Sequence, residues 1–184
     1  MTTAFQQEHS KKQVDDLKKP DSSFKLNLSS IIDGKDTRTT VMIKNIPNKY
    51  TQKMLLQKIN ENHRGEYDFL YLPIDFKNKC NVGYAFINFV DSLFIVNFCE
   101  ELNDKKWERF NSEKICEITY GRIQGKHALV DHFETSNLWY QNDKRVRPLI
   151  LNVHQPSYSF LRDYKKRLQQ DSSLNLGYIK KPSK

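Results

Sequence analysis

The chain has 184 residues, a formal net charge of +8 and a hydrophobic fraction of 38%. This length suits one domain with tails, and this composition fills one modest core. No apolar run approaches the roughly 18 residues that cross a bilayer, and residues 1–19 mix both charges, so neither a membrane span nor a secretory signal is predicted.

The N-terminal stretch, residues 1–36, has the composition of a flexible leader, because Lys, Asp, Ser and Gln dominate it. Its apolar residues are the exception, and they are Phe24, Leu26, Leu28, Ile31 and Ile32. Two interpretations stay open for them. They form a short segment packed on the following domain, or they form a peptide that binds a partner protein.

The first strand and the first helix follow the leader. Apolar residues alternate over residues 39–46, and Pro47 ends the strand. Thr51 is a suitable N-cap for a helix over residues 52–60, whose apolar residues recur on one side.

The second strand is expected over residues 67–72. Asp68 is a poor core residue, so we expect Phe69 and Tyr71 to face the core and Leu70 to lie on the open face. A loop with two lysines follows this strand.

Residues 82–89 carry the most specific pattern in the chain, Val-Gly-Tyr-Ala-Phe-Ile-Asn-Phe. They fit the octamer of an RNA-recognition motif except at Val82, where that motif has Lys or Arg. Side chains on a strand alternate between two faces, so Tyr84 and Phe86 share one face and the residues between them share the other. We therefore predict two aromatic rings on an exposed sheet face, each able to stack a base with ~1–3 kcal/mol. Burial of both rings as ordinary core is the alternative.

Residues 41–46 lie where the partner hexamer of the same motif is expected, with aliphatic residues and Asn45 in the usual places. Met42 replaces the usual aromatic ring. Its thioether can cover a base face, or it only fills space, and the sequence favours neither.

A stripe of apolar residues over 94–102 predicts the second helix, capped by Asp91 or Ser92, and residues 115–120 predict the fourth strand. The order strand, helix, strand, strand, helix, strand predicts an α+β fold, the ferredoxin-like βαββαβ sandwich of an RNA-recognition motif. In this fold a four-stranded antiparallel sheet carries two helices on one face.

A C-terminal helical extension follows the fourth strand. Residues 125–136 predict a third helix with Leu129 and Phe133 four apart. This helix docks on the sheet edge, or it covers the open face and gates access to RNA. A further short helix is expected around residues 160–168.

Positive charge is concentrated in the C-terminal flank. Residues 141–184 hold ten basic and three acidic residues, whereas residues 37–140 hold fourteen and thirteen. Beside an aromatic sheet face, contact with phosphate is the favoured interpretation. The candidate RNA-binding residues are three stacking side chains, Met42, Tyr84 and Phe86, and the cations Lys44, Lys77, Lys79, Arg122, Lys126, Lys144, Arg145 and Arg147.

Four stretches, residues 40–51, 67–89, 122–126 and 143–148, resemble the C-terminal RNA-recognition motif of the mei-two-like family, meiosis-regulating RNA-binding proteins of fungi and plants. The two departures from the general motif, Met42 and Val82, are also typical of that family. The resemblance implies an RNA-recognition fold with a C-terminal extension, single-stranded RNA as ligand, and a role in meiosis or post-transcriptional regulation in the nucleus or cytoplasm. Members usually carry two further such motifs upstream, for which this chain has no room, so we expect a fragment or a stand-alone relative.

The chain is divided into a flexible leader (1–36), the RNA-recognition-motif domain with its extension (37–151) and a basic tail (152–184). Binding of single-stranded RNA is the first functional hypothesis. The second is a protein-interaction module whose sheet face is covered by the third helix, with the leader or that helix as the contact for a protein partner. Exposure of Tyr84 and Phe86 separates the two hypotheses.

An enzyme is not expected. The sequence has no phosphate-cradling Gly-rich loop, no His-Glu-x-x-His helix and no nucleophile elbow. The three cysteines are far apart and match no metal-ligand spacing, so no metal or other cofactor is predicted.

Overall fold

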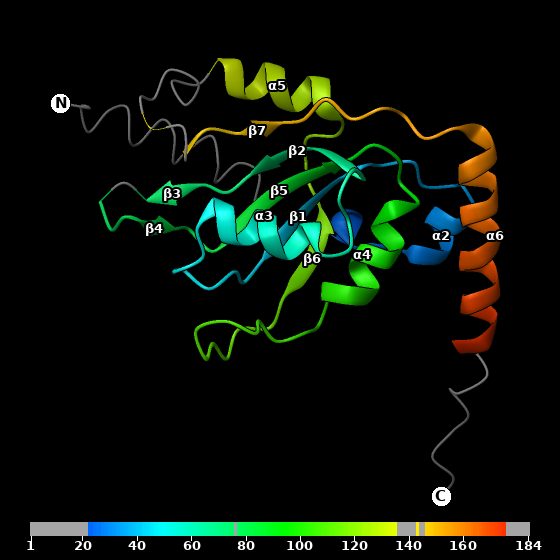
Figure 1. Cartoon of the computed structure of the whole chain (residues 1–184), viewed down its shortest axis with the longest axis horizontal. Coiled ribbons are helices and arrows are strands. Elements are labelled where there is room, and N and C mark those ends of the chain that lie inside the picture. Colours follow the sequence, from blue (N-terminus) through cyan, green and yellow to red (C-terminus); the bar gives the residue numbers. More distant parts are fainter. Residues whose placement is uncertain (1–21, 76, 136–142, 144–145, 176–184) are drawn as a thin grey trace, which may run out of the picture.

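The computed structural model describes residues 22–75, 77–135, 143 and 146–175, and Figure 1 shows their arrangement. Its centre is an antiparallel sheet of five strands in the order β6-β1-β5-β2-β7. In chain order these strands are β1 (Thr40–Lys44), β2 (Tyr67–Tyr71), β5 (Tyr84–Phe89), β6 (Glu117–Tyr120) and β7 (Leu149–Ile150). A two-stranded hairpin of β3 (Ile74–Asp75) and β4 (Cys80–Asn81) lies between β2 and β5 in the chain. The predicted fold class is confirmed, but the C-terminal extension adds β7 beside β2 and makes the sheet one strand wider than expected.

Helices flank the sheet on both faces. The helical segments are η1 (Ser22–Phe24), α2 (Leu28–Ile32), α3 (Gln52–Asn60), α4 (Phe94–Leu102), α5 (Lys126–Glu134) and α6 (Tyr158–Asn175). α3 and α4 pack on one face of the sheet and α5 packs on the other. α6 lies beside α2 and α4 at the end of the molecule (Figure 1).

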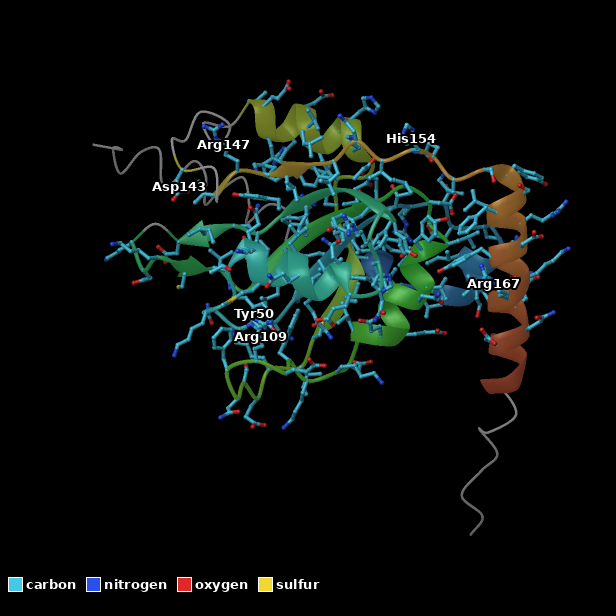
Figure 2. The ribbon with its side chains drawn as sticks, in the orientation of Figure 1. Tyr50, Arg109, Asp143, Arg147, His154 and Arg167 are labelled. Atoms are coloured by element: carbon cyan, nitrogen blue, oxygen red, sulfur yellow. The ribbon has the colours of Figure 1, made fainter. Side chains whose placement is uncertain are left out.

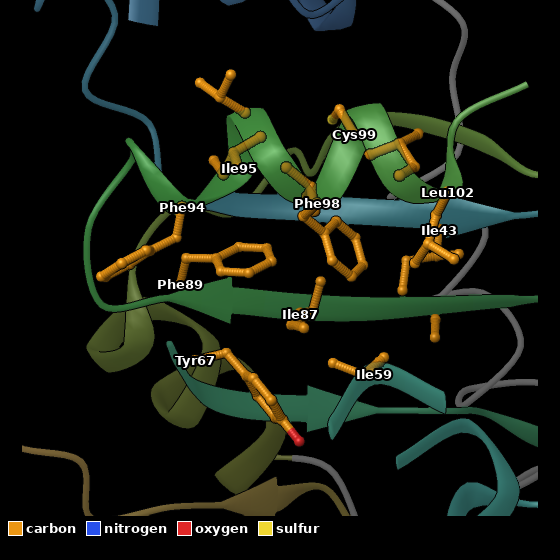
Figure 3. Close-up of a cluster of buried hydrophobic side chains, with 14 of the residues drawn as sticks. Ile43, Ile59, Tyr67, Ile87, Phe89, Phe94, Ile95, Phe98, Cys99 and Leu102 are labelled. Carbon is orange, nitrogen blue, oxygen red and sulfur yellow. The ribbon is translucent and has the colours of Figure 1, made fainter. Parts of the chain in front are cut away.

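The core between the sheet and helices α3 and α4 follows from the alternation of apolar side chains. Ile43 of β1 and Ile87 and Phe89 of β5 point to this face, and Ile59 and Phe98 of the helices pack against them (Figure 3). The rings of Phe89 and Phe98 meet edge to face with their centroids 5.0 Å apart. Burying each such side chain contributes about 1.5–3 kcal/mol. The octamer residues that were predicted to face the core, which alternate with Tyr84 and Phe86, are confirmed in this position: Ala85, Ile87 and Phe89.

The side chains of β2 point to the opposite faces from those predicted. Phe69 and Tyr71 lie on the face away from α3 and α4, whereas Tyr67 and Leu70 lie in the core. The expected orientation is wrong because the register of β2 against β5 shifts between Tyr67 and Phe69, as in a β-bulge. The shift lets Asp68 share the face of Phe69, which keeps its carboxylate out of the apolar core.

Part of the predicted leader is folded. The five apolar residues noted in it all contact the core, Ile31 and Ile32 as buried members and the other three at its border. The Asn27 side chain caps α2 by accepting a hydrogen bond from the Ser30 N–H at 3.0 Å. Of the two interpretations of this segment, packing on the domain is the one that the structure shows.

The basic tail contains a longer helix than expected. α6 begins at Tyr158, close to the expected start, and continues to Asn175, well past the expected end at residue 168. Its Tyr164 is buried beside Phe94 of α4, with ring centroids 5.3 Å apart, and Leu168 joins the same core. None of the described helices combines the length and the apolar composition that crossing a membrane requires.

Candidate nucleic-acid interface

The sheet face opposite α3 and α4 carries a cluster of aromatic side chains and one methionine. Met42 of β1, Phe69 and Tyr71 of β2, and Tyr84 and Phe86 of β5 form it, and we call this set the aromatic face. The strand register brings them together, because Phe86 lies opposite Met42 on one side and Tyr71 on the other. The rings of Tyr84 and Phe86 meet edge to face at 5.8 Å. The face has four rings, and the two that sequence reasoning missed come from the bulge in β2.

Helix α5 covers the aromatic face (Figure 1). Its Leu129 and Phe133 are each 1% exposed and pack into the cluster. Beneath them Tyr84 is 6% exposed and Phe86 is 1% exposed. The prediction that these two rings stand open to solvent is wrong, and the alternative of burial holds. The physical reason is that four rings and Met42 make a large apolar surface, which α5 removes from water.

Phe133 lies among the rings of β2. Its ring is nearly parallel to that of Phe69, with an interplanar angle of 21° and centroids 5.9 Å apart. Its edge contacts Tyr71, with centroids 4.7 Å apart and an angle of 62°. Both arrangements are favourable for aromatic pairs. Burial raises the pKa of Tyr71 above its ordinary value, so its hydroxyl stays protonated at physiological pH.

Directional hydrogen bonds hold the residues before α5 against β1. The Gln124 side chain accepts hydrogen bonds from the N–H groups of Thr39 and Thr40 at 3.0 and 2.9 Å. Its amide donates to the carbonyl oxygens of Thr40 and Gly121. Gly125, whose φ of 86° favours glycine, donates its N–H to Thr40 Oγ1 at 2.9 Å. The root of α5 is therefore fixed by polar contacts, whereas Leu129 and Phe133 are held by apolar packing.

A buried polar network borders the aromatic face. Asn88, which is 3% exposed, accepts a hydrogen bond from the Thr40 hydroxyl at 2.8 Å and donates one to Asp68 at 2.8 Å. The second oxygen of Asp68 lies 3.9 Å from Lys126 Nζ, which donates to the Leu151 carbonyl at 2.9 Å. The network links three strands, the first residue of α5 and the chain that leaves β7. Lys126, which was predicted to contact RNA, is therefore engaged by Asp68 and Leu151 of the same chain.

Four other predicted cations lie on β1, on the β3–β4 turn and between β6 and α5. Lys44 is opposite Tyr84 in the β1–β5 register and pairs with Glu117 at 2.9 Å. Lys77 and Lys79 are exposed on the turn between β3 and β4, and Arg122 is exposed between β6 and α5.

The C-terminal cations divide into two groups. Figure 2 shows half-buried Arg147 near one end of the molecule and Arg167 of α6 at the other. The predicted sites Lys144 and Arg145 lie outside the described residues. The positive charge of the flank is therefore not gathered beside the aromatic face in the part of the chain that is described.

Two kinds of titratable group bear on the chemistry. His132 of α5 has a buried Nε2 with no hydrogen-bond partner among the described residues, and burial lowers the pKa of its ring. Burial raises the pKa of the Cys99 and Cys116 thiols to about 12, so neither is a thiolate nucleophile at neutral pH. Within the described ranges, His, Cys, Asp and Glu form no group that is able to hold a metal ion.

Comparison with known proteins identifies the fold family. The family described as RNA recognition motif 2 matches residues 38–134, which is more than half of the chain. The chain belongs to this family. Its members bind RNA and are not enzymes, which confirms the expectation that this chain is not an enzyme.

Plant relatives show the same relationship. The chain is 59% identical over 133 residues to Protein MEI2-like 2 of Oryza sativa subsp. japonica, covering 72% of this chain and 16% of that protein. It is 55% identical over 140 residues to Protein MEI2-like 3 of Arabidopsis thaliana, covering 76% of this chain and 18% of that protein. The expected resemblance to the mei-two-like family is confirmed, and the chain spans less than a fifth of the length of these relatives.

Among solved structures, the chain is similar to the Rna15 RNA-recognition motif with bound RNA (GU). The TM-score is 0.41 and the identity is 19%, and the match covers 52% of this chain and 96% of that one.

Proposed function

We propose that this domain binds single-stranded RNA on its aromatic face, and that it acts in meiotic or other post-transcriptional regulation. The observation that carries the proposal is the composition of this face in an RNA-recognition fold: four rings and Met42 on adjoining strands. Unstacked bases lie on such rings, each with ~1–3 kcal/mol.

RNA has to displace α5 from the face in order to reach these rings. Leu129 and Phe133 are the buried side chains of α5, and burying each contributes about 1.5–3 kcal/mol, so closure is worth ~3–6 kcal/mol. RNA that stacks a few bases and pairs several phosphates supplies a comparable free energy. The closed state therefore lowers the apparent affinity for RNA without abolishing binding.

Phosphate contacts are expected from cations that remain accessible. Lys77 and Lys79 stand exposed on the β3–β4 turn, and Arg122 stands exposed beside the root of α5. Their exposed ammonium and guanidinium groups are accessible to the phosphates of a bound RNA strand. We propose nuclear or cytoplasmic localisation because transcripts occur in both compartments.

Titration of the whole chain with fluorescein-labelled single-stranded RNA tests the proposal. The parent is the Phe133→Ala variant, in which α5 is loosened, so that the effect of a second substitution on closure is reduced. Adding Phe86→Leu removes a flat ring and should weaken binding by ~1–3 kcal/mol. Adding Tyr158→Leu is the control, because that ring is 82% exposed on α6 and is not a member of the aromatic cluster. Equal affinities in all three proteins would refute the role of the aromatic face.

A second candidate function is binding of an amphipathic helix from a partner protein on the same face. The burial of Tyr84 and Phe86 under α5 favours it, because exposure of these rings is the feature that separates the two hypotheses. A leucine and a phenylalanine four residues apart on α5 already fill the face. A labelled peptide of residues 123–136 added to the Phe133→Ala variant separates the two. If RNA displaces the peptide from the face, the RNA-binding proposal is supported. If the peptide binds equally well with and without RNA, the protein-interaction function is supported.

A further inference from the structure

The side chain of Phe133 occupies a slot in the aromatic face that is shaped for a flat ring. Phe69 forms its floor, nearly parallel to Phe133 at 5.9 Å and 21°, and Tyr71 forms its wall at 4.7 Å and 62°. All three rings are at most 2% exposed, so the slot is filled and dry. A nucleobase is also a flat, weakly polar ring, and it stacks on aromatic side chains in the same offset-parallel manner.

The slot lies on β2 and not on the strands that carry the hexamer and the octamer. Tyr71 is directly opposite Phe86 in the register of β2 and β5, so the slot adjoins the ring of the octamer. The shift in register at Asp68 creates the slot, because without it Phe69 would face the helices. A base on Phe86 and a base in the slot would therefore be neighbours across two paired strands.

We propose that Phe69 and Tyr71 form a base-binding subsite on β2, in which a base of single-stranded RNA takes the place of the Phe133 ring. The proposal rests on the RNA-binding function proposed above and adds a subsite to it. The ring of α5 and the RNA base compete for one position, so the subsite is filled by protein without RNA and by a base with RNA. Stacking in the slot recognises any base, because every base has a flat face.

The neighbours of the slot are compatible with a nucleotide. Phe69 is opposite Asn88 in the register, and Asp68 joins these two on the same face. The ammonium group of Lys126 lies 3.9 Å from the Asp68 carboxylate, at the root of the helix that has to move. The slot is thus apolar on its floor and wall and polar at its border, as base sites with adjoining sugar and phosphate require.

The test uses the whole chain with Phe133→Ala as parent, because that change empties the slot in every variant compared. Adding Phe69→Leu keeps an apolar side chain but removes the flat floor. It should weaken binding to single-stranded RNA by roughly 5- to 150-fold, the effect of losing one stacked base. Tyr158→Leu in the same parent should leave the affinity unchanged. Circular dichroism verifies that each variant is folded.

A second measurement leaves β2 intact. RNA containing 4-thiouridine is photo-crosslinked to the Phe133→Ala protein, and the crosslinked residues are mapped by mass spectrometry. Crosslinks at Phe69 or Tyr71 support the subsite. Crosslinks confined to β1 and β5, together with a loss of affinity in Phe86→Leu but none in Phe69→Leu, would overturn the subsite and leave the RNA-binding function standing. Absence of RNA binding in every variant would overturn both.

Discussion

Replacing Phe133 by alanine should strengthen RNA binding, although Phe133 is a fully buried residue. The change removes a ring that packs on Phe69 and Tyr71 and that is 1% exposed. Losing such a ring from the closed state costs about 2–3 kcal/mol, somewhat less than the ~3–5 kcal/mol for phenylalanines in rigid cores, because α5 is able to settle. The open state loses nothing comparable, since Phe133 is out of its slot there.

This cost translates into affinity through the population of the open state. With closure worth ~3–6 kcal/mol, the open state of the unaltered chain is populated at only about one part in 150 to one part in 25,000. Destabilising the closed state by about 2–3 kcal/mol therefore multiplies the open population, and the apparent RNA affinity, by roughly 30- to 150-fold.

Fluorescence anisotropy with labelled single-stranded RNA measures the change. Glu134→Ala is the matched control, because Glu134 is an exposed residue of the same helix and is adjacent to Phe133. It should bind RNA as the unaltered chain does. An unchanged or weaker affinity in a folded Phe133→Ala variant would refute the reasoning, because RNA would then bind without displacing α5.

Three further predictions concern pH, salt and stability. Burial lowers the pKa of His132 in the closed state, so protonation favours the open state, and RNA affinity should rise as the pH falls through about 6.5. His132→Gln should abolish this rise, whereas His127→Gln, at an exposed position of the same helix, should leave it in place. Replacing Lys77 and Lys79 by glutamine should flatten the slope of log affinity against log salt by about 0.7 for each phosphate that is no longer neutralised, and an identical slope would exclude a role of these lysines in phosphate binding. Ile31→Ala should lower the free energy of unfolding by about 2–5 kcal/mol in urea titrations, and a change within error of zero would show that α2 is not part of the folded core.

The alternation of side chains made much of the fold predictable. Ile87 and Phe89 face the helices and Phe86 faces the other way, because a regular strand allows no other arrangement. α3 begins and ends as predicted, and Thr51 caps it by accepting a hydrogen bond from the Met54 N–H at 3.2 Å. Such features depend on residues that are close in sequence, so a single sequence is enough to recognise them.

The orientation of β2 was not predictable from alternation alone. Phe69 and Tyr71 turn away from the core because the register slips by one residue at Asp68. A regular strand with Asp68 on the open face also keeps the carboxylate out of the core, so the local sequence did not indicate a bulge. The bulge accommodates this carboxylate and places Tyr67 and Leu70 in the core instead. The hydrogen-bond partner of Asp68, Asn88, lies on another strand, so the bulge depends on a contact that is distant in the sequence.

The covering of the aromatic face could be anticipated only as one of two options. Leu129 and Phe133 predict a helix with an apolar side, but their spacing does not say which surface that side contacts. The contacts that decide it are long-range. Gln124 binds the start of β1, and β7 returns to pair with β2, so both flanks of α5 are held over the sheet.

Nuclear Overhauser spectroscopy of the RNA-saturated protein tests most directly whether RNA occupies the face that α5 now covers. In the free protein the ring protons of Phe133 and Tyr71 should show strong cross-peaks, because their centroids are 4.7 Å apart. We predict that saturating single-stranded RNA abolishes these cross-peaks and replaces them with cross-peaks between Tyr71 and base protons. Cross-peaks between Phe133 and Tyr71 that persist in the complex would contradict binding on this face.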